Sequence, residues 1–302
     1  MARVCIDWYP KGWDKRQRKA GFYLDDTLKQ QLDVLINNIT DDWDFTILIT
    51  GSGQVRVGKS VLAMQIGAYW AYEVQRLFGK KTIFNVNPNF VFDGKKLIEK
   101  GNYLGINYPY NVLVFDEAGA DLEGRKAIQS ITQDVLDFYR ECGQYNLMNI
   151  LVIPEYFDLP RGIAMSRSIF LIDVRYTATK EGKFKRGYFF FYNRKRKKRL
   201  YLRGKKELNY NAEPYSFRGR FYPFYPIDEA EYRLEKQHAL STRENKRRNK
   251  FQKQRDAAWF ILTTEFKVNQ IELGKRMEQL TGIYTPQQTI SDALIRLKGE
   301  ND

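Results

Sequence analysis

The sequence predicts an α/β fold in which a mostly parallel sheet is covered by helices on both faces. Three observations lead to this class. Short apolar runs rich in β-branched and aromatic residues recur along residues 45–174, helical stretches separate them, and a glycine-rich loop joins the first run to a long helical pattern. Strands buried on both faces of a parallel sheet have this continuous apolar character, whereas strands with one wet face alternate.

The expected strands follow one another along the chain. The first is Phe45–Thr50, and the further runs are Lys81–Val86, Val112–Phe115, Asn149–Ile153 and Ile169–Val174. A helix is expected from Ser60 to Leu77. It should end at Gly79, because glycine readily adopts the left-handed conformation that closes a helix. A polar and aromatic lead-in segment, residues 1–43, precedes the first strand and contains a helix around Thr27–Ile36.

The composition indicates a folded, strongly basic protein. Hydrophobic residues make up 43% and aromatic residues 15% of the 302 residues, which is typical of a chain that buries a core. Lys and Arg together number 50 against 36 Asp and Glu, so the formal net charge is +14. Such a balance favours a polyanionic partner, with nucleic acid as the first candidate and an acidic membrane surface as the second.

The cysteines and the apolar segments exclude several classes of protein. Cys5 and Cys142 are far apart and form no CxxC pair, so neither a disulfide framework nor a zinc site is predicted. His238 is the single histidine and lies in a charged stretch, which excludes a catalytic triad that needs histidine. We find neither a secretion signal nor a membrane-spanning run, and we expect a cytoplasmic protein.

The loop between the first strand and the long helix carries the strongest functional signal. A loop that holds a triphosphate must turn several backbone N–H groups inward, and glycine permits the necessary turns. Lys59 is expected to neutralise the β- and γ-phosphates during catalysis, and the Ser60 hydroxyl to ligate Mg²⁺. The pattern and its strand–loop–helix context predict a P-loop. Its expected ATP-binding residues are Gly53, Gln54, Val55, Arg56, Val57, Gly58, Lys59, Ser60 and Val61.

Two adjacent acids close the apolar run Val112–Phe115. Asp116 is expected to hold the Mg²⁺ shell, and Glu117 to orient and polarise the attacking water. This is a Walker B motif in form, and the second acid favours hydrolysis over simple binding. A guanine-reading Asn-Lys-x-Asp element is absent from the sequence, so ATP is the expected nucleotide.

An arginine that stabilises the transition state is the next expectation. Arg140, Arg161 and Arg167 follow the Walker B strand, and Arg140 and Arg167 are taken as catalytic candidates contributed to a neighbouring subunit. Arg56, inside the loop, is a candidate that would act within its own subunit. A surface position or an ordinary salt bridge is the alternative for each of these residues.

The order of these motifs resembles the FtsK–HerA superfamily of DNA-pumping ATPases, and the zonula occludens toxin-like ATPases are the most similar group. The resemblance spans roughly residues 44–176 and includes Tyr139–Gln144 and Ile150–Glu155. It implies a RecA-like core and a ring, with a hexamer as the expected form, that threads double-stranded DNA. It also places Glu155 where a polar sensor of the γ-phosphate stands, which requires a paired or protonated carboxyl.

A basic β-hairpin is expected within residues 177–206. Strands Gly187–Tyr192 and Leu200–Leu202 would flank a turn of cationic residues that binds the DNA backbone. These residues are Arg194, Lys195, Arg196, Lys197, Lys198 and Arg199. A solvated tip without a ligand and an acidic membrane surface are the alternatives.

The last part of the chain predicts a helical module. Residues 44–226 form the expected ATPase domain and residues 227–255 a charged helical linker. Residues 256–302 contain helices Asp256–Phe266, Gln270–Leu280 and Thr285–Leu297, a helix-turn-helix-like arrangement. Gln287, Gln288 and Arg296 are its expected DNA contacts. A helical bundle that only joins subunits is the alternative.

Three functions remain open from the sequence. The first is an oligomeric ATPase that translocates or packages DNA. The second is a replication or transposition accessory ATPase that uses ATP as a switch when it loads a further DNA-processing protein onto DNA. The third is a DNA-binding regulator that holds nucleotide without turnover, and Glu117 argues against it.

Overall fold

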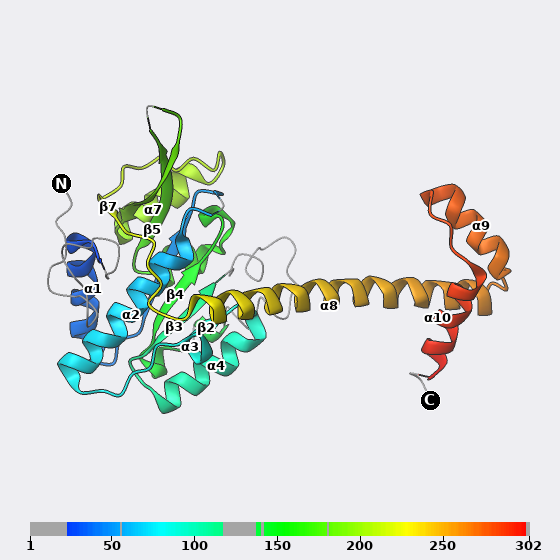
Figure 1. Ribbon diagram of the computed structural model, residues 1–302, viewed down its shortest axis with the longest axis horizontal. Coiled ribbons are helices and arrows are strands. Elements are labelled where there is room, and N and C mark those ends of the chain that lie inside the picture. Colours follow the sequence, from blue (N-terminus) through cyan, green and yellow to red (C-terminus); the bar gives the residue numbers. More distant parts are fainter. Residues whose placement is uncertain (1–22, 55, 117–136, 140–141, 180, 300–302) are drawn as a thin grey trace. The chain divides into compact units, whose positions relative to one another are not determined.

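The computed structural model describes residues 23–54, 56–116, 137–139, 142–179 and 181–299 (Figure 1). The chain forms two compact units, residues Met1–Lys236 and Gln237–Asp302. Among the described residues, no helix combines the length and the apolar character that a bilayer crossing needs.

The first unit is built on a 7-stranded sheet in the order β2-β3-β4-β1-β5-β6-β7. The strands are β1 (Phe45–Thr50), β2 (Phe90–Val91), β3 (Val112–Asp116), β4 (Met148–Val152), β5 (Leu171–Ala178), β6 (Phe184–Tyr192) and β7 (Phe217–Arg220). Strands β2, β3, β4, β1 and β5 are parallel, whereas β6 and β7 are antiparallel to their neighbours. The predicted α/β class with a mostly parallel sheet is confirmed.

Helices cover the two faces of this sheet. Helix α1 (Asp26–Asn38) precedes the sheet, α2 (Lys59–Phe78) follows β1, and α4 (Gly94–Asn107) precedes β3. A Cβ added to Gly67 of α2 would lie 3.3 Å from Val112, and one added to Gly101 of α4 would lie 3.4 Å from Leu113. Consecutive residues of a strand point to opposite faces, so α2 and α4 pack on opposite faces of β3.

The expected strand Lys81–Val86 is wrong. Residues 81–84 are without regular structure, Val86 begins the short helix α3 (Val86–Asn89), and the edge strand is β2. The Phe84 ring packs on Phe90 and close to Gly67 of α2 instead of joining the sheet. The apolar residues of this run cover a helix, and periodicity cannot separate that use from pairing in a sheet.

The expected basic hairpin is also wrong. The turn between β5 and β6 lies at residues 179–183, and the cationic run Asn193–Arg199 starts helix α7 (Arg194–Gly204). The Asn193 side chain accepts a hydrogen bond from the Arg196 N–H at 3.0 Å and caps the helix. Long unbranched Lys and Arg are good helix formers, and Lys197, Leu200 and Tyr201 bury one face of α7.

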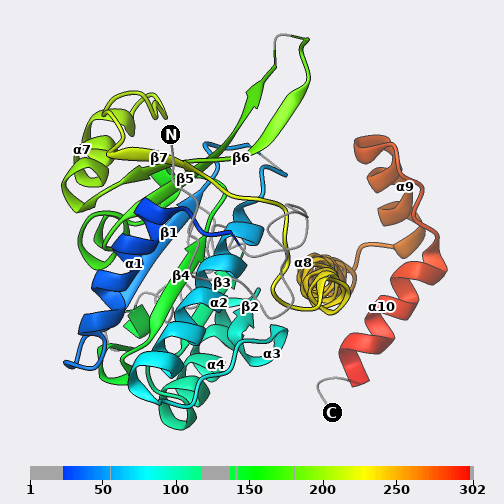
Figure 2. The same ribbon diagram turned by 60° about the vertical axis from the view of Figure 1, so that its left-hand side comes forward.

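Short helical turns lie between the strands, and α7 packs on two of them. They are η2 (Cys142–Tyr145), η3 (Tyr156–Asp158) and η4 (Gly162–Arg167). Helix α7 contacts η3, η4 and β6, which Figure 2 shows at the β5–β6 side of the sheet. The same view shows the ends of β5 and β6 projecting beyond the other strands.

The second unit is helical. Helix α8 runs without a break over Glu229–Thr264, so the expected linker and the expected helix Asp256–Phe266 are parts of one helix. Helix α9 (Gln270–Thr281) and helix α10 (Gln287–Gly299) follow. Asn269 caps the start of α9 through its side chain, and Gly282 ends α9 at φ +69°. The core of the unit consists of Trp259, Leu273, Ile290 and Ala293.

Candidate nucleotide site

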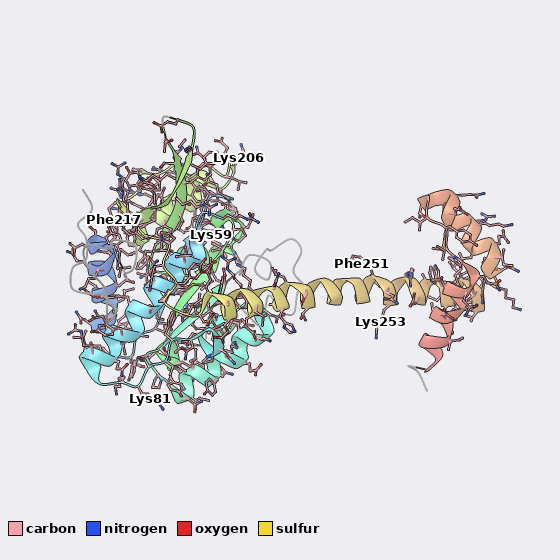
Figure 3. All side chains as sticks on the ribbon, viewed as in Figure 1. Lys59, Lys81, Lys206, Phe217, Phe251 and Lys253 are labelled. Atoms are coloured by element: carbon pink, nitrogen blue, oxygen red, sulfur yellow. The ribbon has the colours of Figure 1, made fainter. Side chains whose placement is uncertain are left out.

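The glycine-rich loop lies where the sequence places it, between the end of β1 and the start of α2. Its backbone takes the conformations that a tight loop needs, because Gly53 has φ +71°, Arg56 φ +57° and Gly58 φ +103°. The N-terminus of α2 follows at once, and Figure 3 labels Lys59 there. Backbone N–H groups of a loop and of a helix N-terminus together attract phosphate. Val55 lies outside the described residues.

The Lys59 side chain folds back under the loop. Its Nζ atom donates a hydrogen bond to the Gln54 carbonyl oxygen at 2.9 Å. A Cβ added to Gly51 would lie 3.1 Å from the same Nζ atom, so only glycine leaves the ammonium this room. The structure thus holds one positive charge at the centre of the loop, where a triphosphate would be neutralised.

Ser60 and Asp116 form the second part of the site. The Ser60 Oγ atom donates to Asp116 Oδ2 at 3.0 Å, although strand β4 lies between β1 and β3. Asp116 is buried. A hydroxyl and a carboxylate are oxygen ligands that suit Mg²⁺, which commonly takes one or two carboxylates together with substrate phosphates and water. The pair therefore fits the predicted cation, while Glu117 lies outside the described residues.

Among the described residues, no larger group of metal-ligating side chains competes with this assignment. Within the part of the chain that the structure describes, no group of three or more His, Cys, Asp or Glu side chains gathers around a point. A cation held by Ser60 and Asp116 would have to complete its shell with phosphate and water oxygens. The chemistry of the donors therefore matches a metal that arrives with a nucleotide.

Two residues of α8 also reach Asp116, and the sequence analysis did not single them out. Lys236 Nζ lies 3.0 Å from Asp116 Oδ2, and the Tyr232 hydroxyl donates to the same oxygen. Tyr232 is buried against the rings of Phe90 and Phe92, at 5.7 and 5.6 Å between centroids. The start of α8 is therefore part of the candidate site.

Glu155 stands beside the loop, directly after β4 and Pro154. The Gly53 N–H donates to the Pro154 carbonyl at 3.1 Å, and a Cβ added to Gly53 would lie 3.6 Å from Glu155 Oε2. Glu155 Oε1 accepts hydrogen bonds from the Tyr210 hydroxyl and the Phe157 N–H. Burial raises the pKa of the Glu155 carboxyl above its ordinary value of 4.5, although Tyr210 acts in the opposite direction. The position expected to hold a sensor is thus occupied by a carboxyl that is paired with Tyr210.

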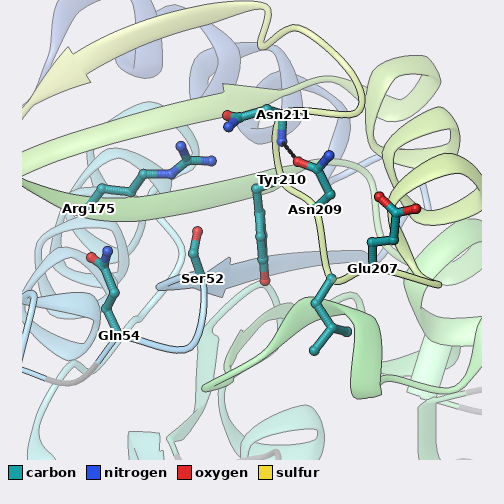
Figure 4. Close-up of a pocket in the computed structure, with 8 residues that line it drawn as sticks. Ser52, Gln54, Arg175, Glu207, Asn209, Tyr210 and Asn211 are labelled. Atoms are coloured by element: carbon teal, nitrogen blue, oxygen red, sulfur yellow. Dashed lines mark hydrogen bonds between the residues drawn. The ribbon is translucent and has the colours of Figure 1, made fainter.

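A polar cavity of about 440 Å³ opens on the β5 side of the loop (Figure 4). Asp173 of β5 is buried and accepts hydrogen bonds from two lining residues, from Ser52 Oγ at 2.7 Å and from Arg175 Nε. Burial raises the pKa of Asp173, and Arg175 opposes that shift. The residues that line the cavity are Ser52, Gln54, Arg175, Glu207, Leu208, Asn209, Tyr210 and Asn211. Arg175 is an arginine near the loop that the sequence analysis did not single out.

Of the arginines expected from the sequence, Arg56 lies in the loop, whereas Arg167 lies away from it. Arg167 donates from Nη1 to Asp44 Oδ1 at 3.0 Å, at the start of β1 and thus at the opposite end of that strand from the loop. Arg56 and Arg161 are exposed. Arg140 lies outside the described residues. Arg167 is therefore engaged in an ion pair within its own subunit.

Several of the cationic residues expected to bind DNA make contacts within the fold, and Arg194 Nη2 donates to the Ser166 carbonyl oxygen at 3.3 Å. Lys197 is fully buried and donates to the Ala164 carbonyl at 2.6 Å. Arg196 donates to the carbonyl oxygens of Pro214 and Tyr215, and Arg199 lies 3.7 Å from Glu213. Arg194 and Lys195 are exposed and Lys198 is half-buried. The hydrogen bonds of Arg196 and Lys197 connect α7 to neighbouring backbone carbonyl groups, so these two side chains stabilise the fold.

Other cationic side chains are exposed close by in the fold. They are Lys183, Lys185 and Arg186 on the projecting ends of β5 and β6, and Arg203, Lys205 and Lys206 at the end of α7. On α10, Gln287 and Gln288 are exposed, and Gln288 donates to Asp292 at 2.8 Å. The side chain of Arg296 lies outside the described residues.

Comparisons with known proteins give partial structural similarity. No family model matches the chain, and no curated protein matches it. Genome packaging NTPase B204 of Sulfolobus turreted icosahedral virus 2, solved with AMPPCP, is 15% identical over 51% of this chain and 94% of that chain, with a TM-score of 0.33. The N-terminal domain of zonular occludens toxin from Neisseria meningitidis is 12% identical over 50% of this chain and 84% of that chain, with a TM-score of 0.33.

A third similar structure is a KaiC-like protein from Pyrococcus horikoshii. It is 16% identical over 50% of this chain and 79% of that chain, with a TM-score of 0.31. All three alignments cover about half of this chain. At these TM-scores the function has to be argued from the site itself.

Proposed function

We propose that this protein is a Mg²⁺-dependent ATPase that acts on DNA as an oligomeric translocating or packaging motor. The observation that carries the ATPase part is the meeting of three residues at one sheet edge. Lys59 lies inside the loop, and Ser60 contacts the Asp116 carboxylate 56 residues further along the chain. A glycine-rich turn without a ligand would not require a buried acid beside the first turn of the helix that follows it.

The residues would divide the chemistry as follows. Lys59 and the loop N–H groups would bind and orient the β- and γ-phosphates, and the α2 N-terminus would add its positive end. Mg²⁺ held by Ser60 and Asp116 would neutralise charge on the same phosphates. Glu117, next to Asp116 in the chain, would accept the proton of the attacking water. Glu155 would sense the γ-phosphate through its hydrogen bond to Tyr210.

The proposed ring would supply the remaining positive charge. Arg140 and Arg167 are proposed to act across a subunit boundary, in a homo-oligomer for which a hexamer is the expected form. Arg167 could do so from the outer end of β1, where it is held by Asp44.

The proposed DNA surface consists of the exposed cationic residues on the β5–β6 ends and α7. Arg194 and Lys195 remain in it from the expected set, and Lys183, Lys185 and Arg186 extend it. The net charge of the chain is +14, and its exposed cationic side chains would bind the phosphate backbone of double-stranded DNA. Such binding releases counterions from the DNA, so its affinity should depend on the salt concentration. Gln287, Gln288 and Arg296 are proposed as further contacts in a helix-turn-helix-like module.

The alternative is an accessory ATPase of replication or transposition, in which ATP binding switches the loading of another protein onto DNA. Both functions need the same nucleotide site, so assembly and DNA stimulation distinguish them. The experiment measures ATP hydrolysis with and without double-stranded DNA, together with the mass of the assembly in the presence of an ATP analogue. Lys59→Ala, Glu117→Gln and the control Lys80→Ala, which removes an exposed lysine beyond α2, are compared with the wild type.

If the protein is a motor, DNA should stimulate ATP hydrolysis and the particles should be ring-sized. Lys59→Ala and Glu117→Gln should lose turnover, and Lys80→Ala should keep it. Monomers or dimers whose hydrolysis ignores DNA would contradict the motor. Hydrolysis that persists in both variants would contradict the site itself.

A further inference from the structure

Helix α8 reaches into the candidate nucleotide site at its first turns. Tyr232 and Lys236, one helical turn apart, both contact Asp116 Oδ2, the same oxygen that accepts from Ser60. The side chain of Asp116 is only 2% exposed and that of Lys236 is 23% exposed. An ammonium therefore lies on Oδ2 of the acid that is expected to hold the cation.

The segment that leads to α8 is tied to the same site. A Cβ added to Gly58 would lie 3.0 Å from the Phe221 ring, so this ring packs on the glycine at the end of the loop. Gln65 of α2 donates to the carbonyl oxygens of Tyr222 and Phe224, at 2.7 and 2.9 Å. Residues 221–236 thus pass from the loop, along α2, to Asp116.

Asp116 Oδ2 has little capacity for a further partner. A carboxylate offers about four lone-pair positions, roughly two on each oxygen. Ser60, Tyr232 and Lys236 already approach Oδ2. A divalent cation beside this oxygen would also repel the ammonium, strongly so because both charges are partly withdrawn from water.

We propose that Lys236 is a further residue of the nucleotide site, and that it competes with the divalent cation of the bound nucleotide for Asp116 Oδ2. Tyr232 keeps the Asp116 carboxylate oriented, since its ring packs against Phe90 and Phe92. Lys236 Nζ lies 5.9 Å from the centroid of the same ring, so release of Lys236 removes this contact as well. Cation binding then releases Lys236 from Asp116, and the first turns of α8 change with it. This inference rests on the proposed ATPase function.

The test is Mn²⁺ binding in the presence of saturating AMPPCP, read from the electron paramagnetic resonance signal of free Mn²⁺. Lys236→Met should lower the Kd for Mn²⁺ about fivefold, the size expected when a partly exposed ion pair no longer competes. Lys236→Arg keeps the charge and should bind as the wild type does. Arg233→Met is the matched control, because it removes the same charge from an exposed residue of the same helix and should leave the Kd unchanged.

A second readout follows the protein itself. Hydrogen exchange of the amides over residues 229–240 should increase when Mn²⁺ is added to the AMPPCP complex of the wild type. In Lys236→Met this exchange should already be high without Mn²⁺ and should change little. An unchanged or raised Kd in Lys236→Met overturns the proposal, and so does exchange that ignores Mn²⁺ in the wild type.

Nucleotide binding in EDTA separates this inference from the function on which it rests. Binding of AMPPCP that Lys59→Ala weakens, together with an unaltered Mn²⁺ Kd in Lys236→Met, overturns the role of Lys236 and leaves the nucleotide site standing. A wild-type protein that binds no AMPPCP overturns both.

Discussion

Lys197 shows how one side chain changes role once it is buried. Its ammonium is enclosed by α7 and η4, where the Ala164 carbonyl accepts its hydrogen bond, and the Tyr156 hydroxyl donates to the carbonyl of Lys197. Burial lowers the pKa of Lys197 from 10.5 to about 7, and Arg194 and Lys198 add to the effect. Lys197 is therefore expected to make the stability of the fold around α7 depend on pH, and it is not available to bind DNA.

The stability of the wild type relative to Lys197→Met should rise with pH between about 7 and 10.5. In this range the unfolded chain holds a proton on Lys197 that the folded protein does not hold, and stability increases with pH wherever the unfolded state binds more protons. Melting temperatures of both proteins at pH 7 and pH 9.5, roughly the two ends of that window, measure the effect. Lys195→Met, on the exposed side of α7, should show no such trend. A difference between wild type and Lys197→Met that is constant with pH would contradict the burial of this ammonium.

At the scale of elements, α7 illustrates what the sequence did and did not reveal. The run from Arg194 to Arg199 looks like a cationic turn because its charges dominate the composition. The helical signals were present, however, in the Asn193 cap and in the spacing of Lys197, Leu200 and Tyr201. Counting Lys197 as apolar would have completed the buried face, but nothing local predicts that a lysine is buried.

The cap of α7 should be measurable by itself. Asn193→Ala removes the acceptor for the Arg196 N–H and should lower the free energy of unfolding by about 1 kcal/mol. Asn193→Asp keeps an acceptor at the same position and should retain most of that free energy. Urea unfolding of the three proteins gives the comparison. Equal stability of Asn193→Ala and the wild type would mean that α7 does not depend on this cap.

The strand–loop–helix part and strand β3 were predictable because their signals are local. Strand β1 has the bounds that the apolar run indicates, and α2 ends at Gly79 in the expected left-handed conformation. Asp116 was found because it ends a buried strand. Tyr232 and Lys236 were not found, since they lie 116 and 120 residues from Asp116 and no sequence pattern links them to it. Long-range contacts of this kind require the fold.

For the whole molecule, the excess of positive charge and its distribution set the expected partner. The exposed cationic residues of the β5–β6 ends and α7 lie on the same compact unit as the nucleotide site. The proposed DNA binding and the proposed ATP hydrolysis would then belong to one compact unit. The helical unit, Gln237–Asp302, is joined to it through α8, whose first turns contact Asp116.

Removal of two charges from this surface should flatten the salt dependence of DNA binding. The double variant Arg194→Ala, Lys195→Ala should reduce the slope of log K against log salt by about 2, since each phosphate contact contributes roughly 0.9. Binding to double-stranded DNA is measured over a series of salt concentrations. The control is Lys80→Ala, Lys81→Ala, which removes equal charge from the segment after α2. A slope equal to that of the wild type would exclude Arg194 and Lys195 from the DNA surface.

Lys59, Ser60 and Asp116 are proposed to form one site for a metal–nucleotide complex. Titration of a fluorescent ATP analogue, with Mg²⁺ and with EDTA, into the wild type, Lys59→Ala and Asp116→Asn tests it most directly. We predict that Mg²⁺ strengthens binding to the wild type, that Lys59→Ala loses about tenfold or more in affinity, and that Asp116→Asn loses the response to Mg²⁺. Affinity that is the same in all three proteins, with and without Mg²⁺, would contradict the account.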